Sequence, residues 1–192
     1  YQTDRELGAA LAIALNVEVR RLADVGCTQI QVDEPVMARY PQVATEWGIE
    51  LLAEVFAGLP DEVTRTVHIC CGYPDRLDAA GYPKADPAAY QALLPLLDAA
   101  PSVDVLSIED AHRHNDLAVL ETLERTILAL GSLRIASSTV ERADDIARRV
   151  ETVLGAISPE RLVLAPDCGL GMLPRSVAVA KLEALRQTAD LF

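Results

Sequence analysis

The feature that most constrains the fold of this chain is a regular alternation of helix-like and strand-like segments. Segments whose apolar residues recur at three- and four-residue spacing, typical of amphipathic helices, alternate with short β-branched segments that end in polar residues. Predicted helices occupy residues 5–26, 44–59, 86–100, 116–130, 142–157 and 176–191, and predicted strands occupy residues 27–35, 64–71, 102–110, 132–138 and 161–169. Such alternation with short connections indicates parallel strands covered by helices. We therefore expect an α/β fold with five parallel strands.

Composition bounds the size of the core and the class of partner. The chain has 192 residues, of which 51% are hydrophobic, so it can bury one sizeable core and is expected to be one domain over residues 1–192. A formal net charge of −12 argues against nucleic acid and anionic membrane surfaces, because phosphate groups are bound by clustered Lys and Arg. No apolar stretch approaches the roughly 20 residues of a membrane span, and no signal segment opens the sequence. We expect a cytoplasmic protein that binds small molecules.

Every predicted strand ends in polar side chains. In chain order these are Asp33 and Glu34, His68 and Cys70, Glu109 and Asp110, Ser137 and Ser138, and Asp167 and Cys168. In parallel βα folds the carboxyl ends of the strands form the active-site face, because the βα loops converge there. The sequence therefore predicts a functional site at this edge of the sheet.

One group of these residues has the chemistry of a metal site. His68 and Cys70 are two residues apart on a strand, so their side chains project to the same face. Taken alone, the pair is explained as well by a core cysteine beside a histidine that hydrogen-bonds locally. Glu109 and Cys168 end other strands at the same edge, and thiolate, imidazole and carboxylate together make a zinc-type ligand set. Cys71 has the opposite strand parity and is expected to pack in the core.

The remaining polar residues have less specific interpretations. His112 and His114 lie in the segment "EDAHRHND", where solvated histidines or a helix-capping neighbourhood are favoured over a direct catalytic role. For Lys84 and Asp167 a solvated surface charge is the expected state. The longest irregular stretch, residues 71–86, follows the predicted His/Cys strand, and long loops on compact domains are commonly functional.

The segments "IQVDEP", "HIC", "LSIED" and "APDCGLG" together resemble the C-terminal catalytic barrel of cobalamin-independent methionine synthase and its shorter relatives, over nearly the whole chain. The resemblance implies a (β/α)8 TIM barrel with Zn²⁺ at its C-terminal mouth, of which this chain supplies about the last five strands. A missing N-terminal half or a second chain would then complete the barrel, because a five-stranded arc leaves two open edges.

The resemblance also implies residue roles and a reaction. Zinc would be held by His68, Cys70, Glu109 and Cys168, and Asp33 would bind the amino group of homocysteine. Glu34, beside Asp33, is a second candidate for substrate binding. The implied reaction is a zinc-dependent transfer of a methyl group from a folate-type donor to a thiol such as homocysteine, in methionine synthesis.

The sequence departs from the methionine synthases of this family at a proton donor. Their histidine in an Asp-Ile-His-Ser segment is matched here by Ala136 in "RIASS". If the donor is a folate, His112, His114 or water would then have to deliver the proton. Two alternatives remain open: zinc-dependent alkyl transfer from an epoxide to another thiol such as coenzyme M, and a non-catalytic half-barrel.

Overall fold

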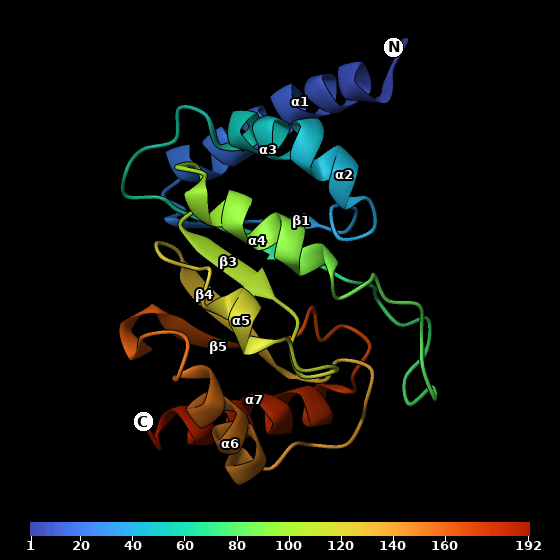
Figure 1. Ribbon diagram of the computed structural model, residues 1–192, viewed down its shortest axis with the longest axis vertical. Helices are drawn as coiled ribbons and strands as arrows, with labels where there is room; N and C mark the ends of the chain where they lie inside the picture. Colours follow the sequence, from blue (N-terminus) through green and yellow to red (C-terminus); the bar gives the residue numbers. More distant parts are fainter.

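The five strands form one parallel sheet in a computed structural model that describes residues 1–192 (Figure 1). Their bounds are Gln29–Glu34 for β1, Thr64–Ile69 for β2, Val105–Ile108 for β3, Ile127–Leu133 for β4 and Leu162–Pro166 for β5. The order in the sheet is β1-β2-β3-β4-β5, so strands adjacent in sequence are adjacent in space. The predicted α/β fold with five parallel strands is confirmed.

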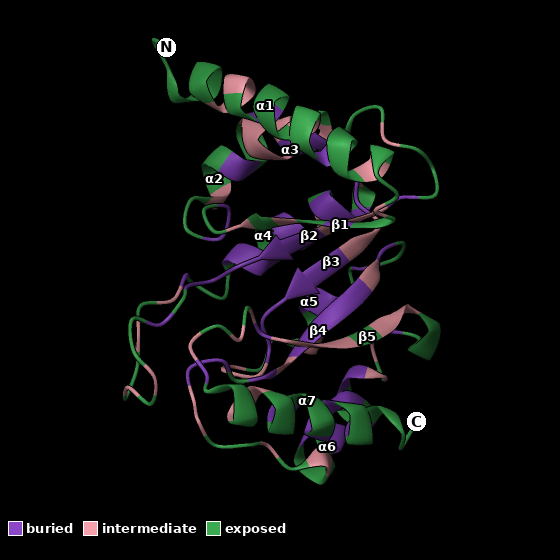
Figure 2. Cartoon of the chain, turned by 180° about the vertical axis from the view of Figure 1, so that it is seen from behind, coloured by how far each residue is buried: buried purple, intermediate pink, exposed green.

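The helices cover one face of this sheet. They are α1 (Asp4–Asp24), α2 (Pro41–Val43), α3 (Ile49–Phe56), α4 (Ala89–Ala99), α5 (Leu117–Leu120), α6 (Ala143–Val153) and α7 (Arg175–Ala189), with a π-helical turn at Ala44–Gly48 and a 3₁₀ turn at Pro159–Arg161. Seen from behind, the strands have no helix in front of them (Figure 2). No helix combines the length and the apolar character that a membrane span requires.

Side-chain alternation gives the two faces of the sheet different characters. On the outer face, residues such as Val67, Leu106 and Leu128 are wholly buried in a core of 29 residues shared with the helices. On the inner face one row runs across all five strands through register partners, and its members are Asp33, His68, Ser107, Ala129 and Val163. The register therefore places a carboxylate, an imidazole and a hydroxyl side by side on the open face.

The fourth strand lies earlier in the chain than the sequence pattern predicts. Residues 116–130 were expected to be helical and residues 132–138 extended, but β4 spans Ile127–Leu133 and the helix shrinks to Leu117–Leu120. The cause is burial on both faces of the sheet, which leaves a continuous apolar run with no alternation. Such a run cannot be distinguished from a buried helix by periodicity alone.

The helix-covered face should supply most of the stability of the fold. Leu106, at the centre of β3, is 0% exposed, whereas Leu96 on α4 is 46% exposed. We predict that Leu106→Ala lowers the free energy of unfolding by about 2–5 kcal/mol, through lost burial and a residual cavity. The matched variant Leu96→Ala should stay within about 0.5 kcal/mol of the wild type. Urea unfolding followed by circular dichroism measures both, and equal losses would contradict this assignment of the core.

Candidate metal centre

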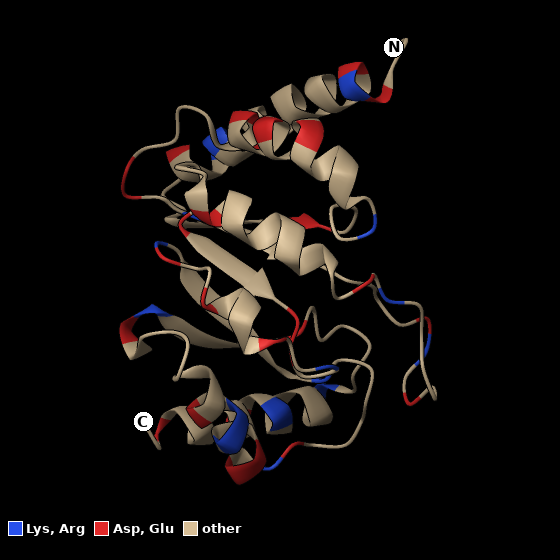
Figure 3. Cartoon of the chain, viewed as in Figure 1, with Lys and Arg blue, Asp and Glu red and all other residues tan.

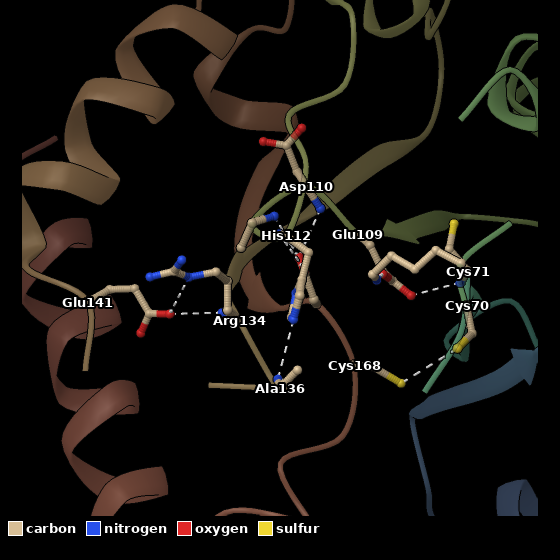
Figure 4. Close-up of polar contacts among 12 residues, drawn as sticks. Cys70, Cys71, Glu109, Asp110, His112, Arg134, Ala136, Glu141 and Cys168 are labelled. Carbon is tan, nitrogen blue, oxygen red and sulfur yellow. Dashed lines mark hydrogen bonds and ion pairs between the residues drawn. The ribbon is translucent and has the colours of Figure 1, made fainter. Parts of the chain in front are cut away.

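Three side chains that can bind a metal converge at the carboxyl ends of β2 and β5. His68 lies in β2, Cys70 directly follows that strand, and Cys168 is the second residue after β5. The ligand atoms of the three residues all lie within 4.8 Å of one another. The Sγ atoms of Cys70 and Cys168 are 4.0 Å apart (Figure 4). The structure thus brings together three of the four residues predicted as zinc ligands.

The donor set fits Zn²⁺ in its atom types and in its geometry. The Nδ1 atom of His68 lies 3.0 Å from Ser107 Oγ, its neighbour in the inner-face row. When Nδ1–H donates a hydrogen bond to that hydroxyl, the lone pair of the imidazole is on Nε2. This Nε2 atom is buried and has no hydrogen-bond partner. Two sulfurs bound to one tetrahedral zinc at about 2.3 Å lie roughly 3.8 Å apart, close to the separation of the two cysteines.

The two thiols share a proton unequally. All four cysteines of the chain are free, so no disulfide competes with metal binding. The hydrogen bond between the two sulfurs raises the pKa of Cys70 well above its usual value and lowers the pKa of Cys168.

Glu109, the fourth predicted ligand, is close to this group but is engaged elsewhere. Its Oε1 accepts the backbone N–H of Cys71 at 2.7 Å, and its Oε2 forms an ion pair with Lys84. The two charged side chains are 2% and 13% exposed, respectively, so the expectation of a solvated Lys84 is wrong. Burial alone lowers the pKa of Lys84, but its hydrogen bonds and charge pairing with Glu109 outweigh that effect and raise it.

Cys71 points away from the metal-binding group, as its strand parity predicts. Its Sγ donates to the hydroxyl of Tyr90 at 3.2 Å, and burial raises the pKa of this thiol. The Tyr90 hydroxyl in turn donates to the carbonyl of Ile69 and accepts the N–H of Glu109, both at 3.1 Å. Cys71 therefore packs in the core.

The two acidic residues that end β1 have different surroundings. Asp33 is exposed on the inner face next to His68, and Gln31 Nε2 donates to its carboxylate at 2.7 Å. Glu34 instead accepts the backbone N–H groups of Val36 at 2.9 Å and of the next residue at 3.2 Å, which fixes the turn after the strand. In Figure 3 the sheet is largely free of charged residues, and acidic residues lie at the end of β1 and directly after β3.

The structure separates the two candidate histidines. His112 lies against Asp167, with its Nδ1 atom 2.7 Å from the carboxylate, and its side chain is 12% exposed. His114 is exposed and lines a different hollow together with residues of α6 such as Asp145 and Arg149. Asp167 itself is 0% exposed, so the expectation of a solvated surface charge is wrong for this residue as well.

The long loop between β2 and α4 is fastened to the loops that follow β4 and β5. Tyr73 donates through its hydroxyl to the carbonyl of Gly169 at 2.9 Å. The carboxylate of Asp78 accepts both the backbone N–H and the hydroxyl of Ser138 at 2.7 Å. The loop therefore crosses the mouth formed by the strand ends. Ser137 and Ser138, predicted to end a strand, lie in the turn region after β4.

Sequence reasoning missed three residues that this geometry brings to the site. Ser107 could have been found, since it is two residues before Glu109 on a strand and its parity directs it inward. Asp167 is named with Cys168 at the end of a predicted strand, but it is expected there to be a solvated charge. Lys84 has no comparable signal, because its position depends on the path of a long loop.

Comparison with known proteins identifies the family of the chain. The sequence model described as the catalytic domain of cobalamin-independent synthase matches residues 89–191, which is more than half of the chain. The chain belongs to the cobalamin-independent synthase family. A B12-independent methionine synthase from Shewanella sp. W3-18-1, solved in complex with selenomethionine, superposes with a TM-score of 0.87 at 27% identity, covering 100% of this chain and 56% of that one. The five strands are therefore part of the TIM barrel that the resemblance predicts.

The names of the related proteins describe more than one enzymatic activity. Methionine synthases of Thermococcus kodakarensis and Sulfolobus acidocaldarius are 30% and 28% identical to the chain, each over 95% of it and 48% of their own length. A 2-hydroxypropyl-CoM lyase of Xanthobacter autotrophicus is 29% identical over 96% of the chain and 54% of its own length. The chain thus spans about half the length of the curated relatives it matches.

The ion pair of Lys84 and Glu109 should be strongly coupled in the metal-free protein. We predict that Lys84→Met lowers the free energy of unfolding by about 3 kcal/mol in the presence of a chelator, because a buried carboxylate then lacks its counter-charge. The double variant Lys84→Met/Glu109→Gln should recover much of this stability. A double-mutant cycle, with each variant unfolded in urea, measures the coupling between the two residues. Additive losses would contradict the coupling.

Proposed function

We propose that residues 1–192 form the C-terminal part of a single zinc-dependent methyltransferase barrel domain. In this proposal a methyl group passes from a folate-type donor to a thiol such as homocysteine. The observation that carries it is the convergence of two thiols and a buried imidazole whose Nε2 has no partner. Membership of the cobalamin-independent synthase family supports the same reaction class.

The metal would be held by His68, Cys70 and Cys168, with Glu109 as the fourth ligand. Glu109 would have to exchange its ion pair with Lys84 for the metal, and Ser107 would orient the imidazole through Nδ1. When bound, zinc allows an incoming thiol to lose its proton near neutral pH, which supplies a thiolate nucleophile.

The acceptor would be held by the inner-face carboxylate of β1. Asp33 is next to His68 in the register, and the amide of Gln31 fixes one of its oxygens. A carboxylate in this position suits the ammonium group of an amino-acid thiol. Glu34 would support this contact by fixing the turn that follows Asp33.

The remaining strands of the barrel would come from a preceding segment or from a second chain. In the described sheet β1 and β5 each have only one neighbour, and Val163 on the inner face is 50% exposed. Unpaired edges and an uncovered face are costly for a parallel sheet. We infer that the pocket for the methyl donor is shared with the part that completes the barrel.

Zinc binding tests the proposed ligands directly. We predict that His68→Ala, Cys168→Ala and Cys70→Ser each weaken zinc binding by at least about 10–100-fold. The matched control is Cys71→Ser, one residue along the chain, which should retain zinc because its sulfur faces Tyr90. Metal content after dialysis against a weak chelator, measured by mass spectrometry, gives the comparison. Zinc retained equally in Cys70→Ser and Cys71→Ser would overturn the proposed site.

Asp33 should govern the binding of an amino-acid acceptor. We predict that Asp33→Asn raises KM for homocysteine by about 10–100-fold, because a charge-assisted hydrogen bond is lost. The change should be small for 4-mercaptobutyrate, which has the same carbon chain without the amino group. Steady-state kinetics with both thiols give the comparison, and equal changes would contradict a contact between Asp33 and the ammonium group.

A second reaction is favoured by the similarity to a 2-hydroxypropyl-CoM lyase. In that case the acceptor would be a sulfonate thiol such as coenzyme M and the alkyl donor an epoxide. Mass spectrometry of products, with homocysteine or coenzyme M and with N5-methyltetrahydrofolate or epoxypropane, distinguishes the two reactions. A zinc-loaded full-length protein that is inactive with every pair would contradict both and favour a non-catalytic half-barrel.

A further inference from the structure

A buried histidine–carboxylate pair lies at the same mouth and has no part in the proposed zinc or thiol binding. His112 follows β3, and Asp167 follows β5 immediately before Cys168. The Nδ1 atom of the imidazole is 2.7 Å from Asp167 Oδ2, and the carboxylate is 0% exposed. The pair therefore belongs to the same loops that position one of the sulfurs.

Asp167 is held as an anion by several donors. Its two oxygens accept the backbone N–H groups of Asp110 at 2.9 Å, Ala111 at 2.8 Å and His112 at 2.9 Å. Since a carboxylate only accepts hydrogen bonds, the imidazole must direct its Nδ1–H toward Asp167.

The backbone of β4 is adapted to this carboxylate. A Cβ atom at Gly131 would collide with Asp167 Oδ1 and would lie 2.8 Å from the carbonyl oxygen of Ile108. Glycine at this position therefore makes room for the buried anion.

The second nitrogen of the imidazole lies against the segment that follows β4. His112 Nε2 accepts the N–H of Ala136 at a long distance of 3.3 Å, and the imidazole and the Tyr82 ring pack edge to face with centroids 5.5 Å apart. Lys84 Nζ lies 4.7 Å from the same tyrosine ring and pairs with Glu109. Contacts thus run from the imidazole to the proposed metal ligand.

We propose that His112 delivers the proton that the leaving atom of the alkyl donor needs, with Asp167 as its positioning residue. This inference rests on the proposed function. The acceptor sulfur forms a bond to the methyl carbon, the carbon–nitrogen bond of the donor breaks, and its electron pair stays on nitrogen. That nitrogen takes the proton from Nε2 of the imidazolium, and the imidazole becomes neutral. The Nδ1–H group keeps its hydrogen bond to Asp167 throughout.

The described geometry corresponds to the neutral imidazole after this transfer. Nε2 then has a free lone pair, which accepts the weak hydrogen bond from Ala136 N–H. The carboxylate of Asp167 stabilises the imidazolium before transfer. His114 lacks these features, because it is exposed and lies toward α6.

The test compares two methyl donors that differ in their need for a proton. With zinc-loaded full-length protein and homocysteine, His112→Ala should lower the rate of transfer from N5-methyltetrahydrofolate by about 10²–10⁴-fold. Transfer from methyl iodide should stay within about threefold of the wild type, since iodide leaves without protonation. The matched control His114→Ala should keep both rates.

Each other result overturns the inference. If His112→Ala leaves the rate with the folate donor unchanged, the proposed proton transfer from His112 is contradicted. If the rate falls equally with both donors, His112 has a role in folding or thiol binding instead. A wild-type protein that transfers methyl from methyl iodide but from no folate donor also contradicts it. A wild-type protein inactive with both donors contradicts the proposed function, on which the inference depends.

The positioning role of Asp167 has a readout that is independent of turnover. Nitrogen-15 NMR of His112 should show the Nδ1–H tautomer in the wild-type protein at a pH where the imidazole is neutral. In Asp167→Asn the amide can donate as well as accept, so both tautomers should be populated. A tautomer unchanged by this substitution would contradict the positioning role.

Discussion

The parallel register of the sheet is the constraint on which the site depends. Because neighbouring strands run in the same direction, their carboxyl ends meet at one edge, and residues of equal parity form rows on the inner face. One such row places Asp33, His68 and Ser107 side by side. The segments that follow β2 and β5 then add Cys70 and Cys168 to the same place. A shift of one residue in β2 would direct His68 into the core and remove the donor set.

Each buried carboxylate at this edge has a partner within the protein. Glu109 is paired with Lys84, Asp110 with Arg149, and Asp167 with the imidazole of His112. Each of these carboxylates is at most 2% exposed, so each needs a partner to remain ionised. These contacts therefore hold the loops after β3 and β5 in place around the sulfurs. None of these pairs includes Cys70 or Cys168. The two sulfurs are therefore not engaged by these cationic side chains, which suits the binding of a metal cation.

The sequence predicted the fold class and most of the site because both depend on local patterns. Alternating segments identified the five strands, and strand parity assigned Cys70 and Cys71 to opposite sides correctly. Prediction failed where burial on both faces removed the alternation, as in Ile127–Leu133. It also failed for Lys84 and Asp167, because their burial follows from long-range packing of loops. The distinction between His112 and His114 likewise needed the structure, since both lie in the same polar segment.

The central claim is that two sulfurs and one imidazole of this chain bind a single zinc ion. X-ray absorption spectroscopy at the zinc edge of the loaded protein tests this most directly. The account predicts two sulfur neighbours at about 2.3 Å and lighter nitrogen or oxygen neighbours at about 2.0–2.1 Å. A spectrum with only nitrogen and oxygen neighbours, or with four sulfurs, would contradict the site described for His68, Cys70 and Cys168.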